Sequence, residues 1–449
     1  MFKKSLFTLL VIFVLFGSGG CLHAGSLTFD GSIRERFEFL DGMNKKTYGD
    51  GSIDPEGNKH GDAHDRLLLQ RIIAGFIYKH NEYIKFNLHI YDARVWGWSL
   101  DQNDFVKNRG TSDEFVMDCY EEYLELFDAY IEVKNLFIKG LSSRIGRQNI
   151  WYGDRRIFGP GGWGNSIGWL WDAVRFSYKR GKNYIDLWYG QTKTKDPESF
   201  SVTHKHTFQG AGLYSHYKVG NDGAVEPFFA WKNNLFHDVM PEEKTFYMGC
   251  RFYEKDFYGL NWDITYVTEF GDIGDNSVKA YGYVAKIGYR FRRMLWRPNI
   301  VLGRVFASGD DDPSDGTIKT FTRPFGSTDG MHYGRMDIIS WGNMVDNQIN
   351  LYLDPFKNCH LKIAFHDFSL NRAEDRWCYY KIKNKDGNKY KHLGDEIDFQ
   401  LKWDCSEQLQ LQVIYAYFNA GNFVSNNVAH NDAQRFFLQA IYKFKISCF

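Results

Sequence analysis

Residues 27–40 read LTFDGSIRERFEFL, and this stretch decides the fold. Taken at every second residue over 27–39, one side is apolar or small and the other is polar, with Glu35 as the exception. Successive side chains of a β-strand point to opposite faces, so the pattern predicts a strand between two different environments. The apolar side consists of Leu27, Phe29, Gly31, Ile33, Phe37 and Phe39, and the polar side of Thr28, Asp30, Ser32, Arg34, Arg36 and Glu38.

Segments with this alternation recur about eighteen times, each about ten residues long, which suits a tilted strand that crosses a bilayer. Short connections such as 180–183 alternate with long polar ones, as in a barrel with short periplasmic turns and long extracellular loops. The segments begin near residues 27, 66, 82, 123, 137, 171, 183, 208, 224, 244, 259, 279, 298, 345, 359, 395, 408 and 435. The long connections are 41–65, 99–122, 191–207, 309–343 and 371–394.

Composition supports an all-β chain and excludes several classes of protein. The 449 residues include 18% aromatic side chains, 43 Gly and 9 Pro, which favours strands and turns. Mean hydropathy is −0.45, too low for a bundle of transmembrane helices. The chain has 55 basic and 55 acidic residues, so it lacks the basic excess of a nucleic-acid-binding protein. The cysteines are scattered without zinc spacing.

The amino terminus has the pattern of a secretory signal peptide. Lys3 and Lys4 precede an apolar run over residues 6–16 and then the small residues 17–20. The run is too short to span a bilayer as a helix. We therefore expect residues 1–24 to be a signal peptide and residues 25–449 to form one outer-membrane domain.

The pattern predicts a transmembrane, antiparallel, up-and-down β-barrel of about eighteen strands. A soluble sandwich or propeller also alternates apolar and polar residues, so it remains the alternative fold. Two features favour the membrane: the apolar faces end in Tyr, Trp and Phe, and almost every polar face carries charges, as a wet lumen allows.

No catalytic signature occurs in the sequence, and we expect neither an enzyme nor a cofactor. A weak candidate for a Ca²⁺ site is the loop with Asp310, Asp312 and Asp315, although its spacing fails the EF-hand pattern. The informative charges are those expected on inward strand faces. Fixed cations in a narrow tube would concentrate anions, and arginine fits a carboxylate as a fork. The residues expected along this path are Arg34, Arg36, Lys85, Arg94, Arg147, Asp172, Arg175, Arg251, Lys286 and Arg290. The competing interpretation is that these cations pair with lumen acids and only brace the wall.

Several motifs together resemble the alginate-export family of outer-membrane porins. They include Arg144–Gln148 (RIGRQ), Tyr152–Arg156 (YGDRR), Trp171–Phe176 (WDAVRF) and Ala307–Asp310 (ASGD), and the resemblance runs from about residue 27 to the end. It implies an eighteen-stranded monomeric barrel that passes an anionic polysaccharide through an arginine-lined lumen. Arg147, Asp172 and Arg175 match the family motif positions most directly.

We therefore expect a bacterial outer-membrane porin for passive passage of an anionic polysaccharide or oligosaccharide. Its partners would be this solute and outer-membrane lipid, with periplasmic secretion partners left open, and a long loop such as 99–122 or 309–343 would gate its mouth. One alternative is a general small-solute porin, and a weaker one is a secreted glycan-binding β protein or hydrolase.

Overall fold

The computed structural model describes residues 25–105, 116, 118–161, 164–193, 206–235, 240–326, 329–385 and 387–449. The expected signal peptide, residues 1–24, lies outside the described residues. Within the described part, eighteen antiparallel strands form a closed barrel. None of the helices in that part is long and apolar enough to cross a membrane.

The wall follows chain order, each strand pairing with the next. Its strands are β1 (Ser26–Asp41), β2 (His64–Lys79), β3 (Ile84–Trp96), β4 (Glu122–Lys134), β5 (Leu141–Asn149), β6 (Leu170–Arg180), β7 (Asn183–Lys193), β8 (His206–Val219), β9 (Gly223–Asn234), β10 (Glu243–Phe257), β11 (Leu260–Ile273), β12 (Asn276–Arg290), β13 (Asn299–Ala307), β15 (Met344–Phe356), β16 (Cys359–Leu370), β19 (His392–Asp404), β20 (Leu409–Ala420) and β21 (Ala433–Ser447). The short elements are η1 (Gln102–Asp104), β14 (Thr317–Ile318), α2 (Asp329–His332), β17 (Arg376–Trp377), β18 (Ile382–Lys383) and α3 (Asn422–Asn427).

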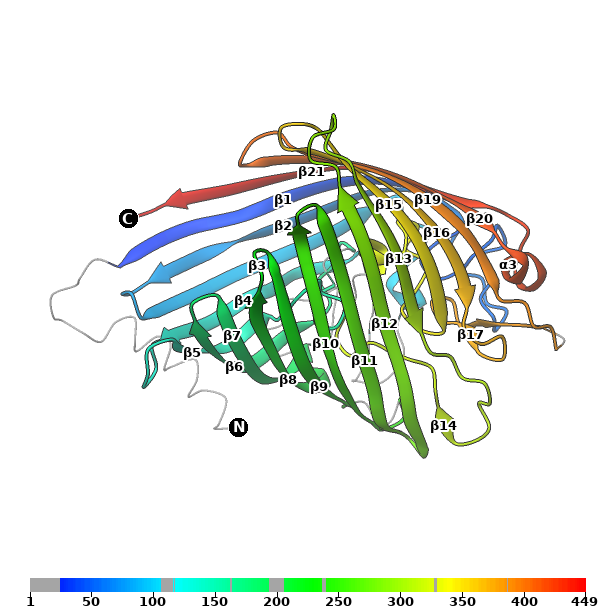
Figure 1. Cartoon of the computed structure of the whole chain (residues 1–449), viewed down its shortest axis with the longest axis horizontal. Helices are drawn as coiled ribbons and strands as arrows, with labels where there is room; N and C mark the ends of the chain where they lie inside the picture. The colour runs from blue at the N-terminus through cyan, green and yellow to red at the C-terminus, as the bar shows by residue number, and fades with distance from the viewer. Residues whose placement is uncertain are drawn as a thin grey trace.

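The first and last strands close the ring. Thr28 to Asp41 of β1 pair with Ser447 to Gln434 of β21 in unbroken antiparallel register. Figure 1 shows these two strands side by side, with the start of β1 and the end of β21 on the side where the carboxyl terminus is marked. Closure satisfies the edge hydrogen bonds that an open sheet would expose, which is what a membrane-spanning sheet requires.

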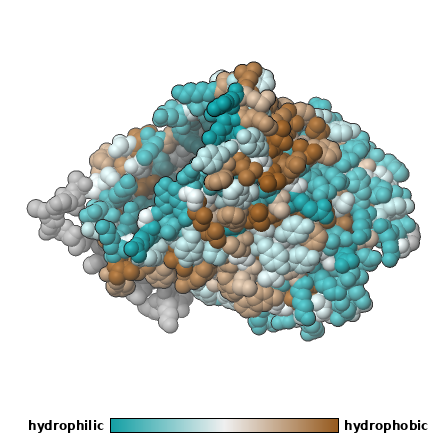
Figure 2. Space-filling model, viewed as in Figure 1, coloured by the Kyte–Doolittle hydropathy of each residue, from teal (hydrophilic) through white to brown (hydrophobic). Residues whose placement is uncertain are grey.

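The two strand faces differ as the alternation predicts. On β1, Ile33 and Phe37 are exposed at 37% and 42%, whereas Arg34, Arg36 and Glu38 between and beyond them are buried at 4% or less. The apolar residues therefore point outward, where lipid would cover them, and the charged residues point inward. Figure 2 shows apolar residues gathered across the wall, with hydrophilic residues toward the end where α3 and the long loops lie. This outward apolar surface rules out the soluble alternatives.

Long loops fold back into the barrel and fill much of its interior near one rim. Phe158, from the β5–β6 connection, and Phe325, from the β13–β15 connection, form an isolated parallel bridge there. Phe325 also packs against the inward-facing Trp171 of β6 with 4.8 Å between ring centroids. Trp341 of the β13–β15 connection is likewise buried in this core. Loop residues thus pack against the inner wall and narrow the interior in this region. The β5–β6 connection is a further long loop that the sequence analysis did not single out.

Candidate functional site

The first charged cluster of the interior surrounds Glu38 on β1. Its carboxylate accepts hydrogen bonds from Arg36 Nη1 and Arg435 Nη2, both at 2.8 Å, and from the Tyr120 hydroxyl at 3.0 Å. The side chains of Arg36, Arg435 and Glu38 are 2% exposed or less. Arg36 Nε also donates to Gln439 Oε1 at 2.8 Å. Arg36 therefore faces inward and is held between neighbours from β1 and β21.

Two further arginines of this region hold a loop. Arg34 Nη2 donates to the Gly164 carbonyl at 2.6 Å and to Asn165 Oδ1 at 2.9 Å, and Arg71 Nη1 donates to the Asn165 carbonyl at 3.2 Å. The Asn165 side-chain amide in turn donates to three backbone carbonyls, including that of Tyr120 at 3.0 Å. Arg34 thus anchors the β5–β6 loop inside the barrel.

A second cluster lies across β9, β10 and β11. Arg251 forms a two-pronged pair with Asp263 at 2.8 and 2.9 Å and also donates to Glu226 at 3.2 Å. The Tyr214 hydroxyl donates to the same Glu226 at 2.6 Å. Arg251 faces inward and forms ion pairs with two carboxylates.

The β5–β6 and β13–β15 loops meet beside this cluster. Arg156 pairs with Asp154 at 2.6 Å and donates to the Tyr333 hydroxyl at 3.1 Å, which ties one loop to the other. Burial alone would raise the pKa of Asp154, but the nearby Arg156 cation holds that pKa below its usual value. Burial and the same cation push the pKa of His332 well below its usual value, so His332 is neutral at physiological pH.

Three more predicted residues face inward with acidic partners. Lys85 on β3 lies 3.3 Å from Glu132, which Arg144 also contacts at 2.6 Å. Arg175 on β6 lies 4.0 Å from Asp186. Arg290, at the end of β12, lies 3.5 Å from Asp354 near the short-turn rim. The competing interpretation, in which lumen cations pair with lumen acids, therefore describes much of the wall.

Lys286 on β12 differs from the residues above. It shares the inward face of β12 with the buried Val284, and no described carboxylate lies within ion-pairing distance of its ammonium. Lys362 on β16 lies on the inward face with the buried Ala364 and likewise has no ion pair with any described residue. Both lysines interact electrostatically with Arg156 and Asp346, so they flank the same part of the interior. Both lysines therefore face the interior without an acidic partner among the described residues.

Arg94 does not line the interior. It lies on the face of β3 that carries Leu88, Ile90 and Trp96, all of them exposed apolar residues. Its guanidinium pairs with Asp92 at 2.7 and 2.8 Å and stacks on Tyr123 with 4.1 Å to the ring centroid. The prediction for Arg94 was wrong because the outward face becomes polar near the rim, where it meets water and headgroups.

Arg147 and Asp172 also depart from the predicted path. The two residues are opposite each other on β5 and β6, on the strand face of Ile145 and Val174 and not on that of Arg175. Arg147 is 4% exposed and binds Asp172 at 2.7 and 2.8 Å and Glu125 at 3.2 Å. These ion pairs of the buried Arg147 join β4, β5 and β6, so their geometry indicates a structural role.

The carboxylates of the acidic loop make contacts within the loop. The Lys319 ammonium bridges Asp311 at 2.5 Å and Asp315 at 2.9 Å, while Asp310 and Asp312 accept backbone hydrogen bonds within the loop. Among the described residues, Asp310, Asp312 and Asp315 are not part of a group whose oxygens converge on one point. Of the cysteines in the described part, Cys250, Cys359, Cys378, Cys405 and Cys448 form no disulfide with one another.

Sequence reasoning missed some of the residues that build the interior. Lys362 alternates with Leu361 and Ile363, and Arg435 alternates with Phe436, so their strand faces could have been assigned. Arg156 lies in a loop, where no periodicity reveals direction.

Comparisons with known proteins agree with this architecture. A family model described as "Alginate export" matches residues 27–437. Among solved structures, Acinetobacter baumannii OccAB2 is similar with a TM-score of 0.60 and 11% identity, covering 96% of this chain and 100% of that one. Pseudomonas aeruginosa OccD3 (OpdP) has a TM-score of 0.56 and 9% identity, covering 96% and 93%. Pseudomonas aeruginosa OccK2 (OpdF), solved in complex with glucuronate, has a TM-score of 0.58 and 11% identity, covering 96% and 100%. No curated protein matches the sequence significantly.

The closed barrel, its outward apolar surface and the family match place this chain in the bacterial outer membrane as a channel. The long-loop rim is accordingly extracellular and the short-turn rim periplasmic. Family and fold are those of channels rather than enzymes. The chain belongs to the alginate export family.

Proposed function

We propose that the channel passes an anionic polysaccharide or oligosaccharide, with Lys286 and Lys362 as the cations that the solute meets. The observation that carries this proposal is that both lysines face the interior and neither has an ion pair with a described residue. Focused in a narrow protein passage, two such cations raise the local concentration of carboxylates. Lysine also suits transit, because a hydrated ammonium on a flexible stem binds each carboxylate weakly.

The arginines have a different role in this proposal. Arg34, Arg36 and Arg435 are almost fully buried and bind loops or Glu38, so they position the loops that narrow the passage. Their positive charge still adds to the field inside the barrel, because charges in a low-dielectric wall act over several ångströms. The solute-facing lysine pair and the supporting arginines on the neighbouring strands β1 and β21 together favour anions.

Uronates are the substrate class that we favour. The family match and the glucuronate complex of Pseudomonas aeruginosa OccK2 both support a carboxylate sugar as the solute. A single chain suffices in this proposal because the ring closes on itself through β1 and β21.

A general small-solute porin is the second candidate. It is favoured by the acidic partners of Arg251, Lys85 and Arg290, which reduce the net charge presented to a solute. The two candidates differ in selectivity, so electrical measurements separate them.

The test is single-channel recording in planar bilayers across a salt gradient, with glucuronate and alginate-derived oligouronates as added solutes. We expect anion preference and a concentration-dependent block by the oligouronates in the wild type, and loss of both in the Lys286→Gln/Lys362→Gln double variant. Lys279→Gln is the matched control, because Lys279 lies on the outward face of the same strand β12. Equal cation and anion currents without oligouronate block in the wild type would leave only the small-solute porin.

A further inference from the structure

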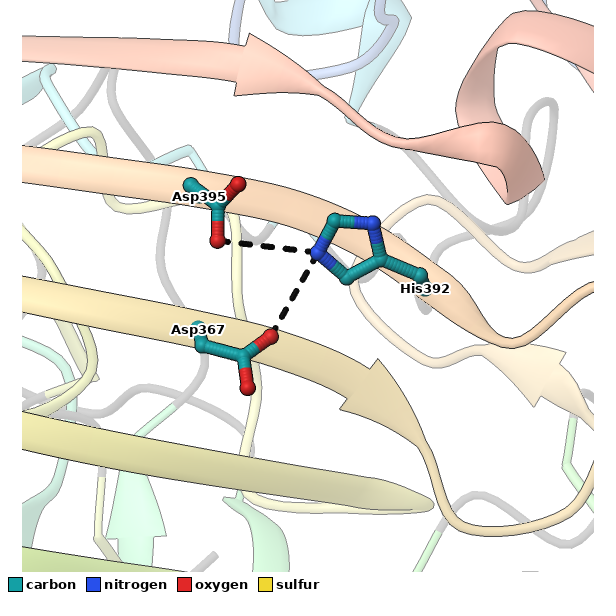
Figure 3. A group of neighbouring side chains, drawn as sticks. All are labelled: Asp367, His392 and Asp395. Atoms are coloured by element: carbon teal, nitrogen blue, oxygen red, sulfur yellow. Dashed lines mark ion pairs between the residues drawn. The ribbon is translucent and has the colours of Figure 1, made fainter.

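A group of potential metal ligands lies on the outer side of the wall, away from the charged interior. Asp367 is near the end of β16, and His392 and Asp395 are at the start of β19. Figure 3 shows the His392 ring turned toward both carboxylates. His392 Nε2 is 3.4 Å from Asp367 Oδ1 and 3.6 Å from Asp395 Oδ1, and the three donor atoms lie within 4.8 Å of one another.

These separations match the spacing of ligand atoms around one ion. Zn²⁺ binds imidazole nitrogen and carboxylate oxygen at about 2.0–2.2 Å in tetrahedral sites, so neighbouring ligand atoms there are about 3.3–3.5 Å apart. The two measured separations lie close to that range. The wall also holds the ligands in place, because Asp367 and Asp395 are directly opposite partners in the β16–β19 ladder.

The surroundings orient each ligand. Asn347 Nδ2 donates to Asp367 Oδ2 at 3.0 Å, which leaves Oδ1 directed at His392. Hydrogen bonding of the second carboxylate oxygen is the usual support of a metal-binding carboxylate. Gly421 packs beside the imidazole, and a Cβ at that position would lie 2.6 Å from His392 Nδ1. The absence of a side chain at Gly421 thus leaves room for this ring orientation.

We propose that Asp367, His392 and Asp395 bind a divalent metal ion of the zinc class at the extracellular rim. One nitrogen and two oxygens suit Zn²⁺ and neighbouring transition ions, whereas Ca²⁺ takes about six to eight oxygen ligands. Three protein ligands leave one coordination position for water or an anionic oxygen. All three side chains are partly exposed, so an ion reaches the site from the medium.

The site lies at the base of the β16–β19 loop, which closes part of the extracellular mouth. Trp377 Nε1 of this loop donates to the Ile338 carbonyl at 3.0 Å, and the Tyr380 hydroxyl donates to the Asn44 carbonyl at 2.9 Å. A bound ion joins the two strands from which the loop departs. It would therefore restrict the movement of the β16–β19 loop, which contacts the β13–β15 and β1–β2 loops inside the mouth.

The experiment is titration calorimetry of the folded full-length barrel in detergent, without a polyhistidine tag, with Zn²⁺ and then Ca²⁺ as probes. We expect the wild type to bind one Zn²⁺ more than His392→Gln or Asp395→Asn. Ca²⁺ should not occupy the site that accounts for this difference. Asn347→Ala should weaken the same site by about 10-fold through loss of its hydrogen bond to Asp367.

The matched control is His360→Gln, because His360 is an exposed histidine 2.7 Å from the single carboxylate Asp354 at the opposite rim. It should bind as many Zn²⁺ ions as the wild type. The heat-dependent gel shift of each variant reports that the barrel is folded. Equal Zn²⁺ stoichiometry in folded wild type and His392→Gln overturns the proposal, because the cluster would then be only an ion pair of a protonated histidine.

Discussion

Placing a charge on the outward face should destabilise the barrel by an amount that depends on depth, and Leu302→Arg is the sharpest test. Leu302 is near the middle of β13 and is 54% exposed in the isolated barrel. Its cross-strand partners are Ile287 and Ile349, exposed at 55% and 52%. Hydrocarbon would therefore surround an arginine here, at a cost of about 2–4 kcal/mol for a midplane site.

The structure favours the lower end of that range. Arg304, two residues further along β13, already lies on the same outward face and bonds to Asn347 at 2.8 Å. At a rise of about 3.4 Å per residue, this polar zone is about 7 Å away, within reach of an extended arginine side chain. We therefore expect Leu302→Arg to lower the free energy of unfolding by about 2 kcal/mol.

The assay is reversible urea unfolding in lipid vesicles, followed by the fluorescence of the 13 tryptophans. Leu302→Ala is the control, because it removes apolar area without adding charge and isolates the cost of the guanidinium. If Leu302→Arg is as stable as Leu302→Ala, the outward assignment of this face is wrong.

Three other outcomes follow from the geometry. Glu38→Gln should lower the free energy of unfolding by about 3–5 kcal/mol in the same assay, because it leaves Arg36 and Arg435 buried without their carboxylate. Arg94→Ala should leave the reversal potential unchanged in bilayer recordings, since Arg94 faces outward; a shift toward cations would contradict that placement. The ring nitrogens of His60 lie 2.7 Å from Asp54 and from Asp104, and these contacts join the β1–β2 loop to the β3–β4 loop. Burial lowers the pKa of His60, but the hydrogen bonds to Asp104 and Asp54 raise that pKa above its usual value. The link is therefore complete below about pH 6.5 and is lost as the pH rises through the raised pKa. The protection of both loops against hydrogen exchange should therefore fall as the pH rises in the wild type. This fall should be smaller in Asp104→Asn.

The sequence predicts the strands of the wall well, because the alternation of apolar and polar residues along each strand indicates its two different environments. The expected and observed starts differ by at most four residues, at the strand expected near 137 that begins at Leu141. The lining is harder to predict, because charge alone does not identify a face. Arg94 has the parity of Ile90, and Arg147 that of Ile145, so strict alternation would have placed both outward.

Loops carry no such periodicity. The contact between Phe158 and Phe325 joins segments far apart in the sequence, and nothing local to either residue indicates it. The narrowed interior therefore emerged only with the three-dimensional structure. The metal-ligand group is similar, since Asp367 and His392 become neighbours only through the pairing of β16 with β19.

The seam between β1 and β21 also constrains how the molecule can be made. It pairs the first strand of the wall with the last, so the final backbone hydrogen bonds of the wall cannot form until β21 has been synthesised. Until then the incomplete sheet has two edge strands, and their unpaired backbone N–H and C=O groups can pair with other chains. Such distant pairing is slow to find, so a carboxyl-terminal truncation should be lost to aggregation or degradation instead of accumulating as a smaller pore.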